Sequence, residues 1–157
     1  MAFREMRRFK QALTDEEIET VITQGKRMVM AVHGDDGYPY CMPLNYVYEN
    51  GKIYFHCALT GHKMDAILNN DKVCINIMDE GYKVEGDWAW WVRSVILFGK
   101  AKIVEDETLK LDQLTNIGLK YFPNKAQARP DAEHSLNRIH IIEITIDHKS
   151  GKLVHEK

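Results

Sequence analysis

Apolar and polar residues alternate along most of this chain, a pattern typical of half-buried β-strands. Three short strands are predicted over 28–33, 52–57 and 72–78. A longer strand is predicted over 92–104, and a last alternating strand covers 138–147. Because short turns join several of these segments, we expect the strands to pair mainly with their chain neighbours in an antiparallel sheet.

Proline and glycine positions predict where this sheet turns or ends. The segment Tyr38–Tyr48 is extended but contains Pro39 and Pro43, which have no N–H to donate. Part of it must therefore lie at a sheet edge or a bulge. Asn50–Gly51 is typical of a two-residue type I′ hairpin turn, because both residues tolerate a positive φ angle. Gly99 interrupts the long strand and predicts a bulge or a barrel corner.

Helices are predicted before and after the central strands. Thr14 and Glu17 have the spacing of a capping box, and the apolar stripe that follows them ends at Gly25. A helix over 107–121 is predicted to stop before Pro123, which cannot continue it.

A further helix is predicted over His62–Asn70, with Met64, Ile67 and Leu68 on one face. The segment 124–137 is polar and is interpreted as a loop. Roughly six strands with a few short helices predict the mainly β (α+β) class and an antiparallel barrel decorated by helices.

The composition is that of an ordinary globular protein. Hydrophobic residues make up 45% and charged residues 28% of the 157 positions, which is too apolar for disorder. Without an internal repeat or linker, a single domain over 1–157 is expected. The formal net charge of −2 gives no general attraction to nucleic acid or to a membrane surface. No stretch approaches the roughly 20 apolar residues that a membrane span requires.

The cysteines indicate a reducing compartment. Cys41, Cys57 and Cys74 are odd in number and have no CxxC spacing. The basic segment 4–10 is not followed by an apolar run, so it is a poor signal peptide. We therefore expect reduced, mostly buried thiols in a cytoplasmic protein, with Cys57 as the one candidate for a reactive thiol.

The clearest chemical signal is Gly61-His62-Lys63, where a loop leads into a helix. Free N–H groups at a helix start, together with an ammonium group, are what a phosphate needs, and His56 and His62 could add donors. The alternatives stay open, because Lys63 and His62 also fit a solvated surface and His56 fits a structural role. The other histidines lack ligand spacing, so no metal site is expected.

Six segments carry a resemblance to a known family: Phe3–Arg8, Gly37–Tyr40, Pro43–Tyr46, Asn50–His56, Gly61–Lys63 and Arg93–Ala101. In this order they resemble the pyridoxamine-phosphate-oxidase-like FMN-binding split barrels, and among these the nitroimidazole-resistance (Nim-type) proteins. The resemblance implies a split β-barrel of six to seven antiparallel strands. It also implies a homodimer with FMN held across the interface, so that one copy does not complete the site.

The resemblance further implies four groups of cofactor-binding residues, which line the ring, follow the ribityl chain, hold the phosphate and complete the pocket: Pro43, Leu44, Asn45 and Tyr46; His56, Cys57 and Ala58; Gly61, His62 and Lys63; Ser94 and Val95. The ring would be contacted through backbone groups and the Asn45 side chain. Cys57 departs from the family pattern, in which a small polar residue such as Ser is expected, and a thiol is a poor donor.

The segment Gly81–Trp91 also departs from the family pattern, because it contains Trp88, Trp90 and Trp91. One of them could stack on the flavin or a substrate, although large aromatics more often fill a core or a dimer interface. Trp90 and Trp91 are adjacent and would face opposite sides of a strand. Arg93 is a candidate contact for an anionic substrate, with a surface ion pair as the alternative.

These inferences point to a flavoprotein, most simply an FMN-dependent, nitroreductase-like oxidoreductase that reduces small aromatic or nitro compounds. The sequence identifies no catalytic acid/base pair and no GxGxxG fingerprint for a nicotinamide donor. Two alternatives stay open: a non-enzymatic flavin-binding module for storage or sensing, and a haem-binding split barrel. Oxidation of pyridoxamine phosphate is disfavoured, because no C-terminal cluster of Arg and His resembles that enzyme's substrate grip.

Overall fold

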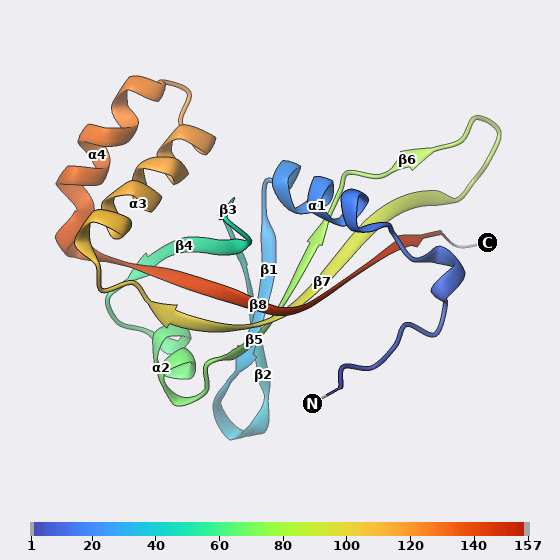
Figure 1. Ribbon diagram of the computed structural model, residues 1–157, viewed down its shortest axis with the longest axis horizontal. Helices are drawn as coiled ribbons and strands as arrows, with labels where there is room; N and C mark the ends of the chain where they lie inside the picture. Colours follow the sequence, from blue (N-terminus) through green and yellow to red (C-terminus); the bar gives the residue numbers. More distant parts are fainter. Residues whose placement is uncertain (1, 156–157) are drawn as a thin grey trace.

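The chain folds around one antiparallel sheet (Figure 1). The structure, a computed structural model, describes residues 2–155. Within these residues the strands are β1 (Met28–His33), β2 (Pro39–Leu44), β3 (Val47–Glu49), β4 (Lys52–Ala58), β5 (Lys72–Met78), β6 (Tyr82–Lys83), β7 (Trp90–Ile103) and β8 (Ile139–Val154). Their order across the sheet is β2-β1-β5-β7-β8-β4-β3, and β6 pairs with β7 beside this path.

The predicted mainly β, antiparallel architecture is confirmed, and the barrel is split. β2 and β3 lie at the two ends of the sheet order although only Asn45 and Tyr46 separate them in the chain. The two prolines of β2 thus lie on an edge strand, as predicted. The strand count of six to seven is too low, because the segment Tyr38–Tyr48 divides into β2 and β3 and because β6 lies within Gly81–Trp91, where no strand is predicted.

Two predicted irregularities are present. Asn50 and Gly51 have φ angles of 51° and 75°, as a type I′ turn between β3 and β4 requires. The pairing of β7 with β8 shifts at Phe98/Gly99, where Asp147 of β8 has no partner in the register. A Cβ on Gly99 would lie 2.5 Å from the carbonyl oxygen of Thr145, so this bulge needs a glycine.

The bulge reverses the side-chain alternation of β8. Before it, Ile142, Ile144 and Ile146 face the core; after it, even-numbered residues such as His148 and Ser150 lie on the other side. β8 continues to Val154, well beyond the predicted end at 147, because it pairs with β7 over almost its whole length.

The helices are α1 (Asp15–Gln24), α2 (His62–Asn69), α3 (Glu107–Tyr121) and α4 (Ala128–Ser135), with short 3₁₀ turns η1 (Phe9–Gln11), η2 (Asp35–Gly37), η3 (Lys125–Gln127) and η4 (Leu136–Arg138). α1 begins with the predicted capping box at Thr14 and Glu17, and α3 has the predicted bounds. The predicted helix at His62 is present as α2. It meets the barrel through Met64, Ala66 and Ile67, whereas Leu68 lies at the margin of the apolar face and is 68% exposed.

The prediction of a loop over 124–137 is also wrong, because this segment contains α4. The buried residues of α4 are Ala128 and Ala132, which are too small to give a strong apolar pattern. They allow α4 to approach α3 closely: a Cβ on Gly118 would lie 2.9 Å from the Cβ of Ala128. The pair is held by small residues rather than by large apolar ones.

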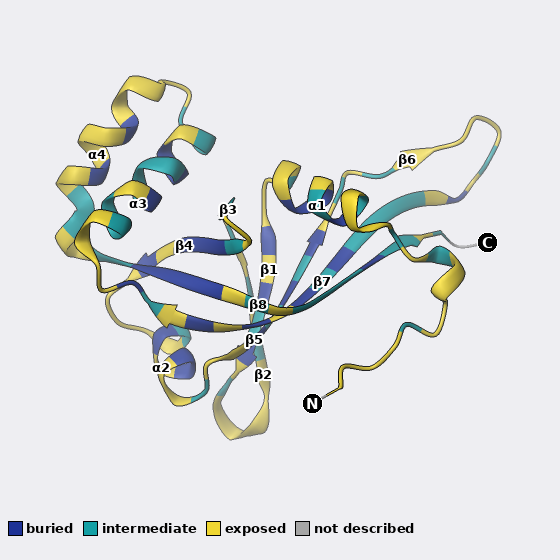
Figure 2. Cartoon of the chain, viewed as in Figure 1, coloured by how far each residue is buried: buried dark blue, intermediate teal, exposed yellow. Residues whose placement is uncertain are grey.

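The main core fills the inner side of the sheet, which α1 and α2 cover (Figure 2). Its fully buried members include Phe55, Ile75, Ile77, Leu97 and Ile144. A second, smaller cluster lies between α3 and strands β3, β4 and β8. β4 therefore contributes to both clusters, with Ile53, Phe55 and Cys57 in the main core and Tyr54 in the second.

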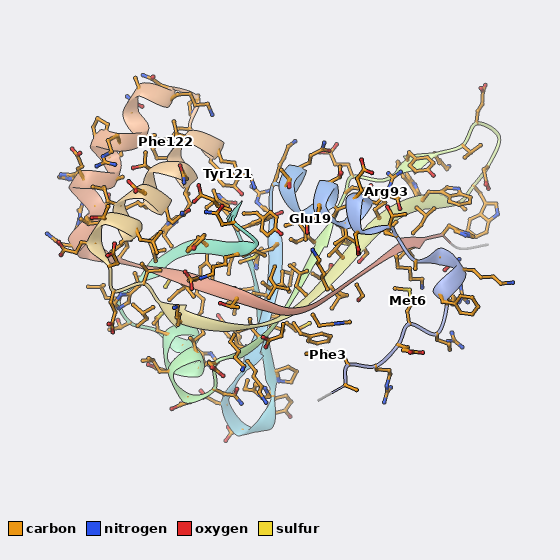
Figure 3. All side chains as sticks on the ribbon, in the orientation of Figure 1. Phe3, Met6, Glu19, Arg93, Tyr121 and Phe122 are labelled. Atoms are coloured by element: carbon orange, nitrogen blue, oxygen red, sulfur yellow. The ribbon has the colours of Figure 1, made fainter. Side chains whose placement is uncertain are left out.

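The seam between β2 and β3 is closed by the end of α3 (Figure 3). Lys120 Nζ donates to the carbonyl oxygens of Gly25 and Tyr46, at 2.7 and 2.9 Å. The Tyr121 hydroxyl accepts from the Tyr46 N–H at 3.0 Å, and the Tyr46 hydroxyl donates to the Ile22 carbonyl at 2.5 Å. Burial lowers the pKa of Lys120 to about 8. Tyr46 is thus a structural anchor at the point where the barrel is split.

The outer side of the same sheet is apolar but largely uncovered. Most outward positions on neighbouring strands hold small or apolar residues: Pro39, Cys41 and Pro43 on β2; Val29 and Ala31 on β1; Cys74 and Met78 on β5; Ile96 and Phe98 on β7. Polar residues such as Lys72, Asn76, Ser94 and Lys100 lie among them. We call this surface the outer face. The N-terminal segment covers one edge of it, where the Phe3 ring stacks on the rings of His148 and Phe98 (Figure 3). The ring centres are 4.6 Å apart for His148 and 5.5 Å apart for Phe98.

Candidate functional site

The predicted phosphate-binding residues lie at the start of α2. Gly61 precedes the helix with a φ of 132°, a conformation that favours glycine, and it offers no side chain to cap the first-turn N–H groups. A Cβ at Gly61 would meet nothing within 4 Å, so the space beside these N–H groups is open. Lys63 lies in the same turn, with its Nζ 5.6 Å from the centre of the Phe55 ring. This is a donor-rich, cationic corner.

The end of β4 lies next to this corner. The charge of Lys63 acts on both His56 and Cys57, which shows that α2 begins beside the last residues of β4. Partial desolvation by the surrounding chain and the Lys63 charge both lower the pKa of His56. His56 and Ala58 are exposed on one side of the strand.

Cys57 faces the other way. Its thiol is buried and donates to the Met64 sulfur at 3.3 Å. Burial raises the pKa of this thiol, and the nearby Lys63 charge offsets only part of that rise. Cys57 is therefore a core thiol that links β4 to α2 rather than a reactive one. Of the other two cysteines, Cys74 is partly buried, whereas Cys41 is exposed on the outer face.

His62 connects α2 to the turn between β1 and β2. Its ring stacks on Tyr40 with the centres 4.2 Å apart, and its Nε2 lies 3.5 Å from a carboxylate oxygen of Asp35. Asp35 and Tyr40 had not been selected from the sequence. Their signal was weak, because one lies in a turn and the other on a proline-rich strand. Their contacts fix the position of His62 beside Lys63.

The ring-lining group Pro43–Tyr46 is divided by the fold. Pro43 and Asn45 are exposed, whereas Leu44 packs against the main core and Tyr46 is fully buried at the seam. The side chains that remain available to a ligand are those of Pro43 and Asn45, together with backbone groups. Tyr46 can support such a site only by holding the chain in place.

Ser94 and Val95 lie on β7, three strands away from β2. The Asn76 side chain donates to the Ser94 hydroxyl at 2.8 Å and to the Val95 carbonyl at 3.2 Å. Val95 itself is fully buried, while Ser94 lies on the outer face. Asn76 is a polar residue at an outward position of β5 between Cys74 and Met78, a signal that strand alternation could have provided.

The three tryptophans lie on a hairpin that projects from the barrel (Figure 2). We call residues 79–91 the tryptophan hairpin. Trp88 and Trp90 are 63% and 55% exposed. The Trp91 ring instead stacks on the His155 ring of the same chain, with the ring centres 4.1 Å apart. The expectation that neighbours Trp90 and Trp91 face opposite sides is confirmed.

Arg93 lies at the base of this hairpin (Figure 3). Its guanidinium is 3.3 Å from Asp79 and 5.9 Å from the centre of the Tyr82 ring. The Asp79 carboxylate also accepts the backbone N–H groups of Arg93 and Gly81. Of the two roles considered for Arg93, the structure shows the ion pair.

A buried carboxylate, Glu143, lies on β8 beside β4. It accepts from Tyr54 at 3.0 Å and lies 2.9 Å from Lys52 and 3.2 Å from Lys102. Although burial acts in the opposite direction, these partners hold the pKa of Glu143 below its ordinary value. Its oxygens are fully engaged, so Glu143 is a structural ion rather than a proton donor.

Two further properties concern residues 2–155. Within this range, no three His, Cys, Asp or Glu side chains are grouped so that they could hold a metal ion. No helix in the same range is long and apolar enough to cross a membrane.

A profile of the family described as pyridoxamine 5′-phosphate oxidase matches residues 14–153 of this chain. The match spans nearly the whole sequence. The chain belongs to this family. A search of curated proteins finds no match.

Solved structures share the split-barrel fold of this pyridoxamine 5′-phosphate oxidase family member. A proposed 5-nitroimidazole antibiotic resistance protein from Bacteroides thetaiotaomicron is 24% identical, with a TM-score of 0.77 over 92% of this chain and 87% of that one. An FAD-binding protein from Mesorhizobium loti is 21% identical, with a TM-score of 0.67 over 92% of this chain and 97% of that one. The flavocytochrome Anf3 from Azotobacter vinelandii is 18% identical, with a TM-score of 0.78 over 96% of this chain and 72% of that one.

Within this family fold, eight of the twelve predicted cofactor-binding residues form two groups. The first group lies where β4 ends and α2 begins, and it contains His56, Cys57, Ala58, Gly61, His62 and Lys63. Pro43 and Ser94 lie on the outer face, on either side of β1 and β5. The cationic corner and the apolar outer face are the two surfaces that a planar, phosphorylated ligand would need.

Proposed function

We propose that this protein is an FMN-binding homodimer that reduces small aromatic or nitro compounds. The observation that carries the proposal is the cationic corner, where uncapped N–H groups, Lys63 and His62 meet at the start of α2. A helix start with an adjacent ammonium is suited to a phosphate group of about two negative charges. Relatives of the same fold include FAD-binding proteins, which supports a flavin as the ligand.

The residues around the corner fit FMN. Gly61, His62 and Lys63 would hold the phosphate, and His56 and Ala58 would lie along the ribityl chain. Pro43, the backbone after it, Asn45 and Ser94 would border the ring on the outer face. Cys57 and Tyr46 would act indirectly, because both side chains are buried away from these positions.

A second copy of the chain is the expected cover of the outer face. An antiparallel sheet normally presents polar residues to water, but the outward positions of β1, β2, β5 and β7 hold few charges. Depletion of charge and enrichment of apolar residues are typical of an interface core. Because a twofold dimer pairs a surface with itself, this face is suited to a homodimer.

FMN, when bound, would supply the redox chemistry for reduction of the substrate. The chain would orient the ring, exclude water from one of its sides and keep an apolar surface for an aromatic substrate. We assign proton donation to the substrate to no particular residue.

The absorption spectrum of the purified protein tests the cofactor. We expect a yellow protein with a flavin spectrum, or one that binds added FMN stoichiometrically. A colourless protein that does not bind FMN at micromolar concentration would refute the proposal. A Soret band would favour haem, which a relative of the same fold binds together with FAD.

Reoxidation of the bound cofactor tests the reaction. The FMN is reduced chemically without oxygen, and a nitroimidazole or a quinone is then added. Rapid reoxidation that saturates with substrate supports an oxidoreductase. A rate no faster than that of free reduced FMN would contradict enzymatic turnover and favour a storage or sensing role.

A further inference from the structure

The N-terminal segment encloses a groove against the outer side of β7 and β8. A cavity of about 610 Å³ lies there. Residues of the segment, among them Phe3, Arg4 and Met6, line one wall, and outward residues of β7 and β8 line the other. Figure 3 shows Phe3 and Met6 on this segment, which runs beside the second half of β8. The groove is separate from the cationic corner, because none of the described residues that line it belongs to α2 or to β4.

The strand wall of the groove is a ladder of three cross-strand pairs. From one end to the other these pairs are Ser94 with Lys152, Ile96 with Ser150, and Phe98 with His148. The Cβ atoms of such a pair are about 5 Å apart. Because four residue steps along a strand cover about 13 Å, the wall is long enough for a fused aromatic ring and one substituent.

One end of the ladder is closed by aromatic rings. The Phe3 ring stacks on the rings of His148 and Phe98. Ile96, the next outward residue of β7, adds an apolar side chain to the wall, at the margin between the groove and the rest of the outer face. A planar apolar group placed here gains burial against aromatic and aliphatic surface. This end is therefore suited to an aromatic ring.

The other end offers hydrogen-bond donors that are not in use. The Ser94 hydroxyl accepts from the Asn76 side chain at 2.8 Å, so its own hydrogen remains to be donated. Lys152 lies opposite Ser94, and within residues 2–155 its ammonium group makes no ion pair or hydrogen bond. Arg4 on the other wall is likewise unpaired within this range, and among the described lining residues the only carboxylate is Glu5. The groove therefore favours an anion.

We propose that this groove binds a small aromatic carboxylate. The carboxylate accepts from Lys152 Nζ and from the Ser94 hydroxyl, and the ring lies along Ile96 toward Phe3. Both donors are half-buried, which strengthens a charge-assisted hydrogen bond. An inorganic anion would leave the apolar part of the groove unfilled, and a neutral aromatic molecule would leave the ammonium unpaired.

Binding at this groove does not rest on the proposed function. Ser94 connects the two, because the proposed function places it at the border of the flavin ring. With FMN bound in that way, the carboxylate would lie next to the ring.

Titration calorimetry at low salt tests the proposal, with 2-naphthoate as the probe and neutral 2-naphthamide as its matched analogue. We expect one naphthoate to bind per chain and the naphthamide to bind at least ~10-fold more weakly, because it cannot accept the charge. Lys152→Met should weaken naphthoate binding about ten- to a hundredfold and leave naphthamide binding nearly unchanged. Lys100→Met removes an ammonium group from β7 outside the groove, so this control should bind naphthoate like the native protein.

Cleavage of the N-terminal segment tests whether the ligand lies beneath it. Arg7 and Arg8 are exposed on this segment, but trypsin can bind them in extended form only when the segment lifts from the barrel. Naphthoate at ten times its Kd should therefore slow cleavage about tenfold. A short arginine peptide controls for inhibition of trypsin itself. An unchanged rate of cleavage would overturn the proposal.

Three results of the calorimetry would also overturn it: no saturable naphthoate binding at about millimolar concentration, equal affinity for the two probes, or native affinity in Lys152→Met. Lys63→Ala distinguishes the groove from the cationic corner, because loss of naphthoate binding in this variant would place the carboxylate at α2 and refute the inference. A protein that binds naphthoate but no flavin would refute only the proposed function. One that binds FMN but no naphthoate would refute only this inference.

Discussion

The two faces of the sheet have similar apolar side chains but different surroundings. The inner face is covered by α1 and α2 and contains the largest fully buried residues of the chain. The outer face has valine, isoleucine, phenylalanine and methionine at outward positions, and within residues 2–155 the N-terminal segment from Phe3 to Phe9 lies over one edge of it. An alternating apolar pattern thus indicates that a face of a sheet becomes buried, but it does not indicate which part of the chain or which other molecule covers it. For the outer face, the cover that we propose is a second copy of the chain.

Truncation of an inner residue should have the largest effect. Phe55→Ala removes a fully buried ring from the main core and leaves a cavity, so the free energy of unfolding should fall by about 3–5 kcal/mol. Urea denaturation at a fixed protein concentration measures the loss. Val29→Ala on the outer face is the control, with an expected loss below about 1.5 kcal/mol. Similar losses for both would remove the distinction between the two faces.

A charge on the outer face should separate the copies. Ile96→Asp places a carboxylate where the second copy would cover it, and we expect association to weaken at least ~100-fold, equivalent to ~2.7 kcal/mol. Light scattering should change from about twice the chain mass of 18.2 kDa to that mass. Leu119→Asp, at an exposed position of α3, should leave the dimer intact. A native protein that is already monomeric would contradict the role of this face.

A substitution in the cationic corner, which lies where the main core borders the proposed ligand site, should have a smaller effect. Lys63→Ala removes a charge-assisted contact of roughly 1.5–3 kcal/mol, so FMN affinity should fall about ten- to a hundredfold. Titration calorimetry with FMN and with riboflavin measures this. Riboflavin has no phosphate and should be affected far less. An equal loss for both would mean that Lys63 supports the fold and that the phosphate binds elsewhere.

The smallest effect is expected at the seam. Lys120 has a pKa of about 8 in the folded chain, below its ordinary value of 10.5. Between these values the unfolded chain binds more protons, so the contribution of Lys120 to the free energy of unfolding should rise with pH above 8. Because this residue is only half buried, we expect no more than about 1 kcal/mol between pH 8 and 9.5. The difference between the native protein and Lys120→Met across this range measures it, and a flat difference would contradict the assignment.

Strand alternation and turn chemistry predicted most of the sheet, because these signals are local. The capping box of α1, the Asn50–Gly51 turn and the bulge at Gly99 each depend on a few neighbouring residues. α4 was missed because its buried side chains are alanines. Its stability comes from close packing on α3, which a periodic apolar pattern does not reveal.

The candidate site was predictable only in part. Gly61 and Lys63 have a local signal at a helix start, but Asp35 and Tyr40 reach His62 from another hairpin, and no sequence spacing indicates that contact. The interpretation of Tyr46 was limited in the same way. Its position beside Asn45 suggested a ring contact, whereas its hydroxyl is used by α1 at the seam.

The unpaired residue in β8 has a consequence for how this family can vary. Asp147 is exposed, and many residue types would suit its position. Its presence, however, sets the phase of the strand: without it, either Ile142, Ile144 and Ile146 or the residues after 147 would point to the wrong side. The position is therefore constrained in length rather than in identity. In an alignment of related sequences, we expect many residue types at this position but no deletion of it. A conservation score based on residue type would therefore rank the position as unimportant, although deleting it would disrupt the barrel.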